Sequence, residues 1–386
     1  MIASQNLLKM ESVNRKEVLV SGASIAGLST AYWLSKLGYH VTVVELASEP
    51  RKGGAAINVQ GDALASAKRM GIFERLKAHR LQLERLEFKT ADDVTVGSTM
   101  LQNEEIPLAD EDIAEIEIER AELITILVEA VEDKVDFLFN SRVIALHETA
   151  DAIHVTFKNG STRAFDLVFG CDGLHSGIRQ LWFGHEAEYA HSLEHYSSLT
   201  IVNHLLIKEN TAQLYSTPGK GVMLNAYNGK TDIIFWFFSE QEISYDYRDT
   251  DQQRSIIAKQ FTGQGWRTAE LLDEVKQANI SYFDKFCQIK MPSWTKGRVA
   301  LVGDAAYCAS PAAGIGASLA MSGAAAVAEA LEKYDGHFDS AFQAYNQNLR
   351  PFIEETQATA LTMLHDFLIP STEEAIRIRN SQESPF

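Results

Sequence analysis

The residues VLVSGASIAG, at positions 18–27, decide the fold, because an apolar run passes directly into a turn of small side chains. Apolar residues then recur at helical spacing from Leu28 to Leu37, and a second apolar run ends at Glu45. A strand, a glycine turn, a helix and another strand in this order predict a βαβ unit of a parallel sheet. We therefore expect an α/β fold organised around this N-terminal unit.

The turn favours a bound dinucleotide. Small residues at Gly22, Ser24, Ala26 and Gly27 let the backbone approach a pyrophosphate, and the N–H groups at the helix start can donate to its oxygens. The carboxylate of Glu45 can accept hydrogen bonds from ribose hydroxyls, and its charge disfavours a 2′-phosphate. The usual pattern has glycine where Ser24 stands, and small residues can also serve close packing alone. The unit predicts FAD or NAD rather than NADP.

Two further turns, far downstream, favour FAD over NAD. Residues 166–179 end an apolar run in the pattern Asp-Gly-x-x-Ser-x-x-Arg, and residues 299–306 end another in Gly-Asp-Ala-Ala. A segment rich in Pro, Gly and Ala follows at 311–318, before an alanine-rich helix. A simple NAD enzyme has no reason to carry two more acidic strand-end turns, so these motifs predict a flavin enzyme.

These spacings resemble the class A flavoprotein monooxygenases, the aromatic hydroxylase family built on the para-hydroxybenzoate hydroxylase fold, over nearly the whole chain. Within that family, residues 51–72 and 367–380 look most similar to the tetracycline destructases, which inactivate tetracyclines. The resemblance implies that NADPH or NADH reduces FAD and that dioxygen then forms a flavin C4a-hydroperoxide. One oxygen atom would be inserted into a polycyclic aromatic substrate, with tetracycline antibiotics as candidates.

The resemblance also implies a Rossmann-like FAD-binding domain, of the glutathione-reductase βαβ type, interleaved with an antiparallel-sheet substrate domain and followed by a C-terminal helix. We assign the FAD-binding domain to residues 15–80, 100–180 and 290–350. The substrate-binding domain is assigned to residues 81–99 and 181–289, and a bridging helix to residues 351–386. In these regions the turns Asn159-Gly160 and Asn228-Gly229 predict hairpins, and residues 199–207 predict a strand.

Several flavin contacts follow from the resemblance. The carboxylate of Asp304 would accept from the ribityl hydroxyls, and the backbone N–H groups of Gly316 and Ala317 would face the pyrimidine edge of the flavin. A helix N-terminus there stabilises the negative charge of reduced flavin. Arg120 would reach the flavin, with a solvated helix-face charge as the alternative. The family pattern Gly-Gln-Gly-x-Asn stands here as Gly-Ile-Gly-Ala-Ser at 314–318, so two polar side chains are absent.

Other matching positions concern the pyrophosphate and the electron donor. Asp172 lies in the Asp-Gly motif that serves both in the family, and the alternative is a structural turn tied by a salt bridge. Arg51 and Asn58 stand where the destructases place a donor-binding arginine and a flavin-binding aspartate, and the asparagine departs from that pattern. No second glycine-rich βαβ unit follows, so NADPH or NADH would bind transiently on the flavin domain.

The substrate would lie between the flavin and the second sheet. Pro311 and Gly314 match positions beside the flavin, and Trp236, in the run 235–238, offers broad apolar area for a flat ligand. Plain core packing is the alternative for this aromatic run, and strand parity decides which pair faces the substrate. We nominate no protein acid or base, because the flavin carries the chemistry.

Composition limits the other partners. The net charge of −17 repels nucleic acid and anionic membrane, and the histidines show no metal-ligand spacing. Three cysteines without a C-x-x-C pair, and sixteen N-terminal residues without an apolar core, predict a cytoplasmic protein. We expect a monomer that uses a small aromatic substrate and dioxygen.

Two alternatives to the destructase function stay open. One is a hydroxylase of the same fold that acts on another aromatic or polyketide metabolite; a halogenase is disfavoured because no W-x-W-x-I-P segment is present. The other is a non-catalytic, FAD-retaining protein that binds the drug without turnover.

Overall fold

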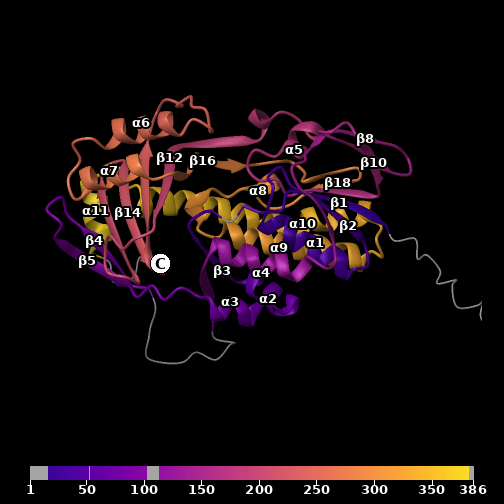
Figure 1. Cartoon of the computed structure of the whole chain (residues 1–386), viewed down its shortest axis with the longest axis horizontal. Coiled ribbons are helices and arrows are strands. Elements are labelled where there is room, and N and C mark those ends of the chain that lie inside the picture. The colour runs from indigo at the N-terminus through magenta and orange to yellow at the C-terminus, as the bar shows by residue number, and fades with distance from the viewer. Residues whose placement is uncertain (1–15, 52, 102–112, 382–386) are drawn as a thin grey trace, which may run out of the picture.

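The protein contains two larger sheets, which lie toward opposite ends of its long axis (Figure 1). The computed structural model describes residues 16–51, 53–101 and 113–381. The prediction that the first sixteen residues contain no secretory signal concerns residues that, except for Lys16, lie outside these ranges. The smaller elements are a three-stranded sheet and a two-stranded ribbon. The mixed α/β fold expected from the sequence is confirmed.

The first large sheet has six strands in the order β17-β18-β11-β1-β2-β7, parallel except for the pair β17–β18. Its central strands are buried apolar runs, as a sheet covered on both faces requires. The strands are β1 (Glu17–Ser21), β2 (His40–Val44), β7 (Asp136–Leu138), β11 (Leu167–Gly170), β17 (Thr295–Lys296) and β18 (Val299–Leu301).

Helices pack around this sheet and place the strand-end turns. Helix α1 begins directly after the glycine turn and packs against α9 and α4. A two-stranded antiparallel ribbon also packs against these helices. The elements are α1 (Ile25–Lys36), α2 (Asp62–Met70), α3 (Phe73–Ala78), α4 (Arg120–Val131), α5 (Gly177–Trp182), α8 (Asp304–Tyr307), α9 (Gly316–Lys333), β3 (Ala56–Gln60) and β6 (Glu115–Glu119).

The second large sheet has seven strands in the order β16-β12-β15-β14-β13-β4-β5. All neighbours are antiparallel except β13 and β4. The strands are β4 (Arg85–Lys89), β5 (Thr95–Met100), β12 (Ala190–Val202), β13 (Thr211–Thr217), β14 (Lys220–Tyr227), β15 (Lys230–Phe238) and β16 (Ile280–Ile289). Helices α6 (Thr250–Phe261) and α7 (Thr268–Gln277) cover one of its faces.

Both predicted hairpins form. Gly160 lies in the left-handed region, with φ +84°, between β9 (Ile153–Phe157) and β10 (Thr162–Phe165), which join β8 (Val143–Glu148) in the three-stranded sheet. Asn228 and Gly229 both have positive φ between β14 and β15, as a type I′ turn requires.

The predicted strand at 199–207 is wrong at its end, because β12 stops at Val202. The side chain of Thr231 explains the departure. Its hydroxyl donates to the carbonyl of His204 at 2.9 Å and accepts from the N–H of Leu206 at 3.0 Å, so the chain turns away from the sheet.

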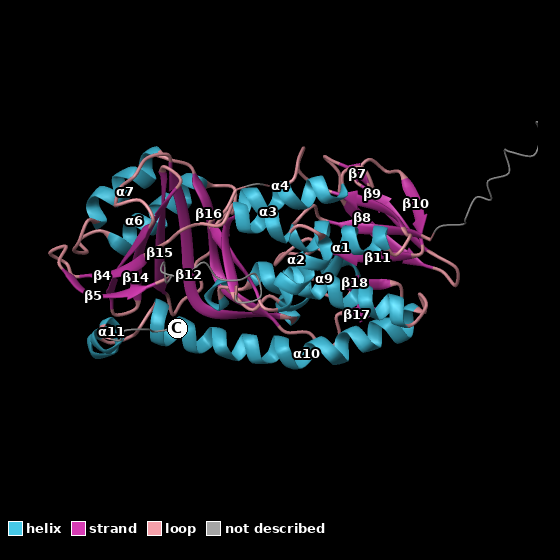
Figure 2. Ribbon diagram, turned by 90° about the horizontal axis from the view of Figure 1, so that it is seen from below, coloured by secondary structure: helices cyan, strands magenta, loops and turns pink. Residues whose placement is uncertain are grey.

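The C-terminal helix begins earlier than residue 351. Helix α10 (Phe338–Thr362) runs without interruption through Pro351 and lies alongside both sheets (Figure 2). A π-helical turn, η3 (Met363–Leu368), and α11 (Glu373–Asn380) follow it. One continuous helix therefore joins residues that we had assigned to separate parts, and residues 382–386 lie outside the described ranges.

Candidate functional site

The N-terminal glycine turn packs too tightly for larger residues. Gly22 has φ +104°, and a Cβ at Gly27 would lie 1.8 Å from the carbonyl oxygen of Gly22. The hydroxyl of Ser24 accepts from the N–H of Gly27 at 3.2 Å and donates to the carbonyl of Cys171 at 2.8 Å. Serine at the usual glycine position therefore caps α1 and ties it to the end of β11.

Glu45 lies at the same edge of the sheet, one residue after β2. One carboxylate oxygen accepts from the N–H of Ala23 at 2.9 Å, and the other accepts from the N–H of Ala47 at 2.9 Å. The carboxylate is thus fixed beside the glycine turn, at the carboxyl ends of parallel strands. Its role as a ribose acceptor stays a prediction.

Asp304 lies in a hollow of this edge. It directly follows Gly303, where an added Cβ would lie 3.0 Å from the Cβ of Ala26, so the third motif meets the first. The Asp304 side chain is exposed to solvent, yet surrounding atoms desolvate it and raise the pKa of its carboxyl. A side chain that is both accessible and desolvated stands at the bottom of a concave surface.

Two arginines belong to the same hollow. Arg120 starts α4, and its Cδ would be 2.5 Å from a Cβ at Gly54, so glycine at 54 leaves room for it. Burial lowers the pKa of Arg120, the carboxylate of Asp304 opposes that change, and the charge of Arg51 adds to it. The three predicted residues Arg51, Arg120 and Asp304 are therefore electrostatically coupled, and Arg120 is not a solvated helix-face charge.

The N-terminus of α9 is open. Gly314 adopts a left-handed conformation, with φ +68°, and Ile315 supplies no side-chain cap to the helix. A Cβ at Gly316 would have no heavy atom within 4 Å, and the next residue, Ala317, continues the first turn. An eighteen-residue helix therefore begins without a side-chain cap and with space beside Gly316, where a bound anionic ring edge could accept from its first N–H groups.

Ser318, which replaces an asparagine of the family pattern, joins this helix to β3. Its hydroxyl accepts from the N–H of Gln60 at 3.0 Å and donates to the carbonyl of Asn58 at 2.9 Å. The side-chain Oδ1 of Asn58 is buried and has no hydrogen-bond partner in the described part of the chain. A buried acceptor without a partner beside an open helix N-terminus fits a ligand with donor groups, such as FAD.

The Asp-Gly motif supports the turn from within. Asp172 accepts from the hydroxyl of Ser176 and from the N–H of Ile178 at 3.0 Å. Arg179 is fully buried and donates to the carbonyl of Ala305 at 2.9 Å and to Glu186 at 3.0 Å. The salt bridge of this motif therefore joins Arg179 to Glu186, and the motif braces the turn that carries Asp304. A direct contact of Asp172 with FAD stays a prediction.

Comparisons with known proteins agree with this geometry. The profile of a protein family described as FAD binding domain matches residues 15–360. The chain belongs to this FAD-binding family. Related proteins named flavin-dependent monooxygenase include one from Legionella longbeachae, which is 34% identical over 92% of this chain and 90% of its own length. The resemblance drawn from the motifs is confirmed, and the chain is a flavoprotein monooxygenase.

Solved structures give the same result for the whole chain. The tetracycline destructase Tet(51) matches with a TM-score of 0.82 and 33% identity, over 95% of both chains. The tetracycline destructase Tet(55) matches with a TM-score of 0.83 and 34% identity, over 95% of this chain and 94% of its own. The monooxygenase is thus similar to destructases along almost its full length.

The parity of β15 is settled. Phe235 and Phe237 are fully buried under α6 and α7, whereas Trp236 and Ile234 lie on the opposite face of the sheet. Trp236 is 8% exposed and packs with Ala312 of η2 (Pro311–Ala313) in one apolar cluster. Pro311 and Gly314 are exposed beside it. The three predicted substrate residues therefore come from adjoining elements.

Two residues near the site of the monooxygenase were not predicted from the sequence. Tyr282 of β16 is 37% exposed, yet burial raises the pKa of its hydroxyl, and the charges of Asp284 and Asp304 add to this. Like Asp304, it is accessible and desolvated, so both face one hollow. His175 follows the Asp-Gly turn and bridges Glu186 at 3.0 Å and Asp284 at 3.1 Å, which raises its pKa to about 10. No local pattern marks either residue.

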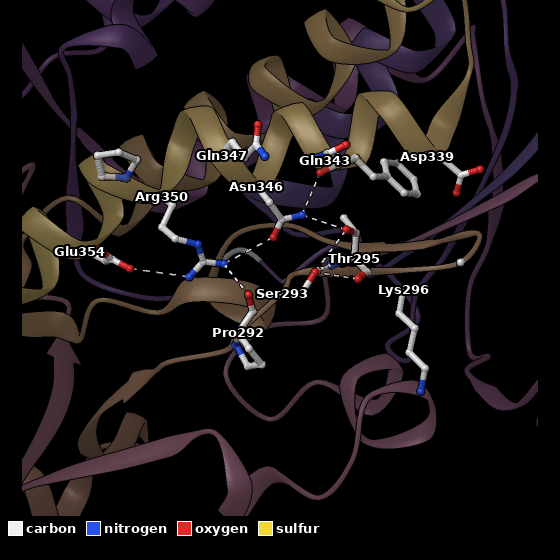
Figure 3. Close-up of a pocket in the computed structure, with 13 residues that line it drawn as sticks. Pro292, Ser293, Thr295, Lys296, Asp339, Gln343, Asn346, Gln347, Arg350 and Glu354 are labelled. Carbon is white, nitrogen blue, oxygen red and sulfur yellow. Dashed lines mark hydrogen bonds and ion pairs between the residues drawn. The ribbon is translucent and has the colours of Figure 1, made fainter.

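A groove of about 600 Å³ lies elsewhere, between α10 and residues 292–297 (Figure 3). Its arginine is already occupied by the protein: Arg350 donates to the backbone carbonyls of Met291 and Pro292 and to the side chain of Asn346. None of the predicted site residues lines it. Within the described ranges, no helix is long and apolar enough to cross a membrane, and no group of His, Cys, Asp or Glu could hold a metal ion.

Proposed function

We propose that this flavoprotein uses NADPH or NADH to insert one oxygen atom from dioxygen into a polycyclic aromatic substrate, and that tetracyclines are among its substrates. The observation that carries the proposal is the meeting of residues 22–27, Asp304 and the α9 N-terminus at one sheet edge, opposite the face that presents Trp236. The similarity to Tet(51) and Tet(55) supports tetracycline as the first substrate to test.

The residues present fit FAD. The glycine turn and Glu45 would hold its pyrophosphate and ribose, Asp304 its ribityl chain, and the α9 N–H groups its pyrimidine edge. When bound, FAD supplies the electron transfer and the oxygen activation. The chain contributes the positive N-terminal end of α9, the neighbouring charge of Arg120, and the concave surface around Asp304, from which a bound ligand displaces water.

The substrate would lie flat between the α9 turn and the sheet. Ile234 and Met223 would offer partly exposed apolar surface, with the buried Trp236 packed beside them. Pro311 would offer an exposed edge and Tyr282 an exposed side chain with a hydroxyl. Burial favours the neutral phenol of Tyr282, so it can donate a hydrogen bond to a substrate oxygen at neutral pH. Arg51 is exposed at the rim and would receive the transient nicotinamide donor.

The test is oxidation of NADPH and NADH by the purified, FAD-loaded protein, with and without tetracycline, followed by mass spectrometry. Faster oxidation together with a product heavier by one oxygen atom supports the proposal. Unchanged oxidation without product, although FAD is bound, would move the substrate to another aromatic or polyketide compound. Tight tetracycline binding without any oxidation would instead indicate a drug-binding protein without turnover.

A further inference from the structure

One end of the sheet face that carries Trp236 is acidic, and Asp232 there forms no ion pair among the described residues. Asp232 of β15 and Asn225 of β14 are directly opposite each other in the register, on the same face as Trp236. Their exposed fractions are 0% and 6%, and one side-chain oxygen of each, Oδ1, has no hydrogen-bond partner in the described structure. Two buried acceptors without partners on one face are costly unless a ligand donates to them.

The neighbours of Asp232 satisfy only part of its carboxylate. The hydroxyl of Tyr227 donates to Oδ2 at 2.8 Å. The backbone N–H of Ala56 also interacts with the carboxylate, and Oδ1 has no hydrogen-bond partner within the described structure. Lys230 attracts the charge of Asp232, but its ammonium is bound to Glu119. Burial, together with the charge of Glu119, raises the pKa of Asp232 to about 6, which leaves it ionised at neutral pH.

A second acid faces the same place from the flavin domain. Glu117 of β6 pairs with Asn58 of β3, so both side chains lie on one face of the ribbon. Burial and the charges of Glu115 and Asp232 raise the pKa of Glu117 to about 7. Among the described residues, no lysine, arginine or histidine forms an ion pair with Glu117 or Asp232. The seam between the domains therefore carries two acidic side chains, and Lys230, which attracts the charge of Asp232, is itself paired with Glu119.

The acidic end continues into an apolar surface. Ile234 and Met223, which are partly exposed, lie between Asp232 and Trp236 on this face. Asp232 and Trp236 are four residues apart on one strand, which is about 13 Å along a β-strand. An apolar strip of this length with acceptors at one end suits a flat, fused-ring molecule that carries a donor group at one edge.

We propose that Asp232 and Asn225 bind a protonated amino group of the aromatic substrate, and that this contact makes the enzyme selective for amine-bearing polycyclic compounds. The inference rests on the proposed function, because it takes this sheet face as the substrate wall. It specifies the class of substrate: a fused-ring cation whose ammonium donates to Asp232 Oδ1 and Asn225 Oδ1 while its rings cover the partly exposed Ile234 and Met223.

The experiment compares two probes with the same ring system in equilibrium dialysis against the FAD-loaded protein. The first is 9-(methylaminomethyl)anthracene, which is cationic at pH 7.5, and the second is 9-anthracenemethanol, which is neutral. We expect the amine to bind at least roughly tenfold more tightly, as a charge-assisted hydrogen bond provides. Asp232→Asn should reduce this preference to within about twofold, and Asn225→Leu should weaken amine binding several-fold without affecting the alcohol.

Asp284→Asn is the matched control, because Asp284 is an acid of the same sheet whose oxygens are held by His175 and Tyr245. It should keep the preference for the amine. Retained FAD and an unchanged melting temperature would show that each variant is folded. If Asp232→Asn does not fold, Asn225→Leu carries the test alone. Equal affinity for the two probes in the unmodified protein, a preference that survives both substitutions, or no binding of either probe would overturn the proposal.

The dialysis needs no nicotinamide and no turnover, so its outcome is separate from that of the proposed function. An enzyme that oxygenates aromatic compounds but shows no preference for the amine would contradict only this inference. A protein that prefers the amine but never consumes NADPH or NADH would contradict only the proposed function.

Discussion

The two sides of the site recognise their ligands by different means. On the flavin side, the groups offered are mostly backbone N–H groups at helix starts, and the decisive feature is the absence of a Cβ at positions such as Gly27. On the sheet side, the groups offered are side chains that one face of β15 presents, such as Trp236. We therefore expect added side-chain volume to disturb flavin binding, and a change of side-chain chemistry to disturb substrate binding.

The largest effect is expected at the flavin side, from Gly27→Ala. Its methyl group would lie 1.8 Å from the carbonyl oxygen of Gly22, so α1 must move away from the turn. Such overpacking costs about 1–3 kcal/mol or more and displaces the N–H groups that face the pyrophosphate. The melting temperature and the FAD content after purification should both fall.

Gly177→Ala is the control for added volume, because a Cβ there meets only an Asp172 oxygen at 3.6 Å. It should leave both measurements unchanged. Full FAD content in Gly27→Ala would show that the turn tolerates a side chain and would remove the contrast.

Asp304→Asn should act on the cofactor with a smaller effect on folding. The carboxylate stands accessible at the bottom of the hollow, and its loss removes an acceptor and the partner charge of Arg120. Hydrogen bonds to charged groups contribute about 1.5–3 kcal/mol, so FAD should bind roughly 10- to 100-fold more weakly. Titration of the apoprotein with FAD measures this, and an unchanged dissociation constant would contradict the assignment.

The two faces of β15 can be separated by a pair of substitutions. Phe235→Leu removes volume beneath α6 and should lower the free energy of unfolding by about 1–2 kcal/mol with little change in substrate affinity. Trp236→Leu also removes buried volume and should lower the free energy of unfolding at least as much, but it should in addition raise the KM for the aromatic substrate several-fold. Denaturant unfolding and steady-state kinetics on both variants decide the matter, and identical behaviour of the two would refute the assigned parity.

The smallest effect is expected at His175, which joins the Asp-Gly turn of the flavin side to Asp284 of the sheet side. Its pKa is raised to about 10 in the folded state, so its stabilisation is complete below its unfolded pKa and is lost as pH rises through about 10. The side chain is 60% exposed, so solvent screening limits the contribution to under about 1 kcal/mol. Between pH 7 and 10, His175→Gln should lose less stability than the unmodified protein. If the two proteins lose the same free energy of unfolding between pH 7 and pH 10, this role of His175 is contradicted.

The flavin side was largely predictable because its constraints are local. A strand end, a glycine and an acid within a few residues suffice to mark Gly22, Gly27 and Asp304. The roles of Ser24 and Ser318 were not predictable, since each bonds to backbone groups more than a hundred residues away. The sequence thus indicates where a cofactor turn lies, but not what replaces a missing residue of the pattern.

The sheet side was predictable only as a set of strands. Which of Phe235 and Trp236 faces the flavin domain depends on the helices that cover the other face, and Tyr282 acquires its surroundings only when β16 pairs with β12. His175 and Asp284 are 109 residues apart in the chain. Such contacts arise from tertiary pairing, which one sequence does not reveal.

The unbroken course of α10 determines how the protein should come apart. Gln357 of this helix donates to the carbonyls of Ile289 and Cys308, and Gln288 donates back to the carbonyl of Gln357. The same helix packs on α9 at one end and continues into η3, against Trp236, at the other. Neither sheet region can unfold without removing α10 from the other. Heating should therefore produce one cooperative transition. Cleavage within α10 should release two unstable fragments rather than two independently folded domains.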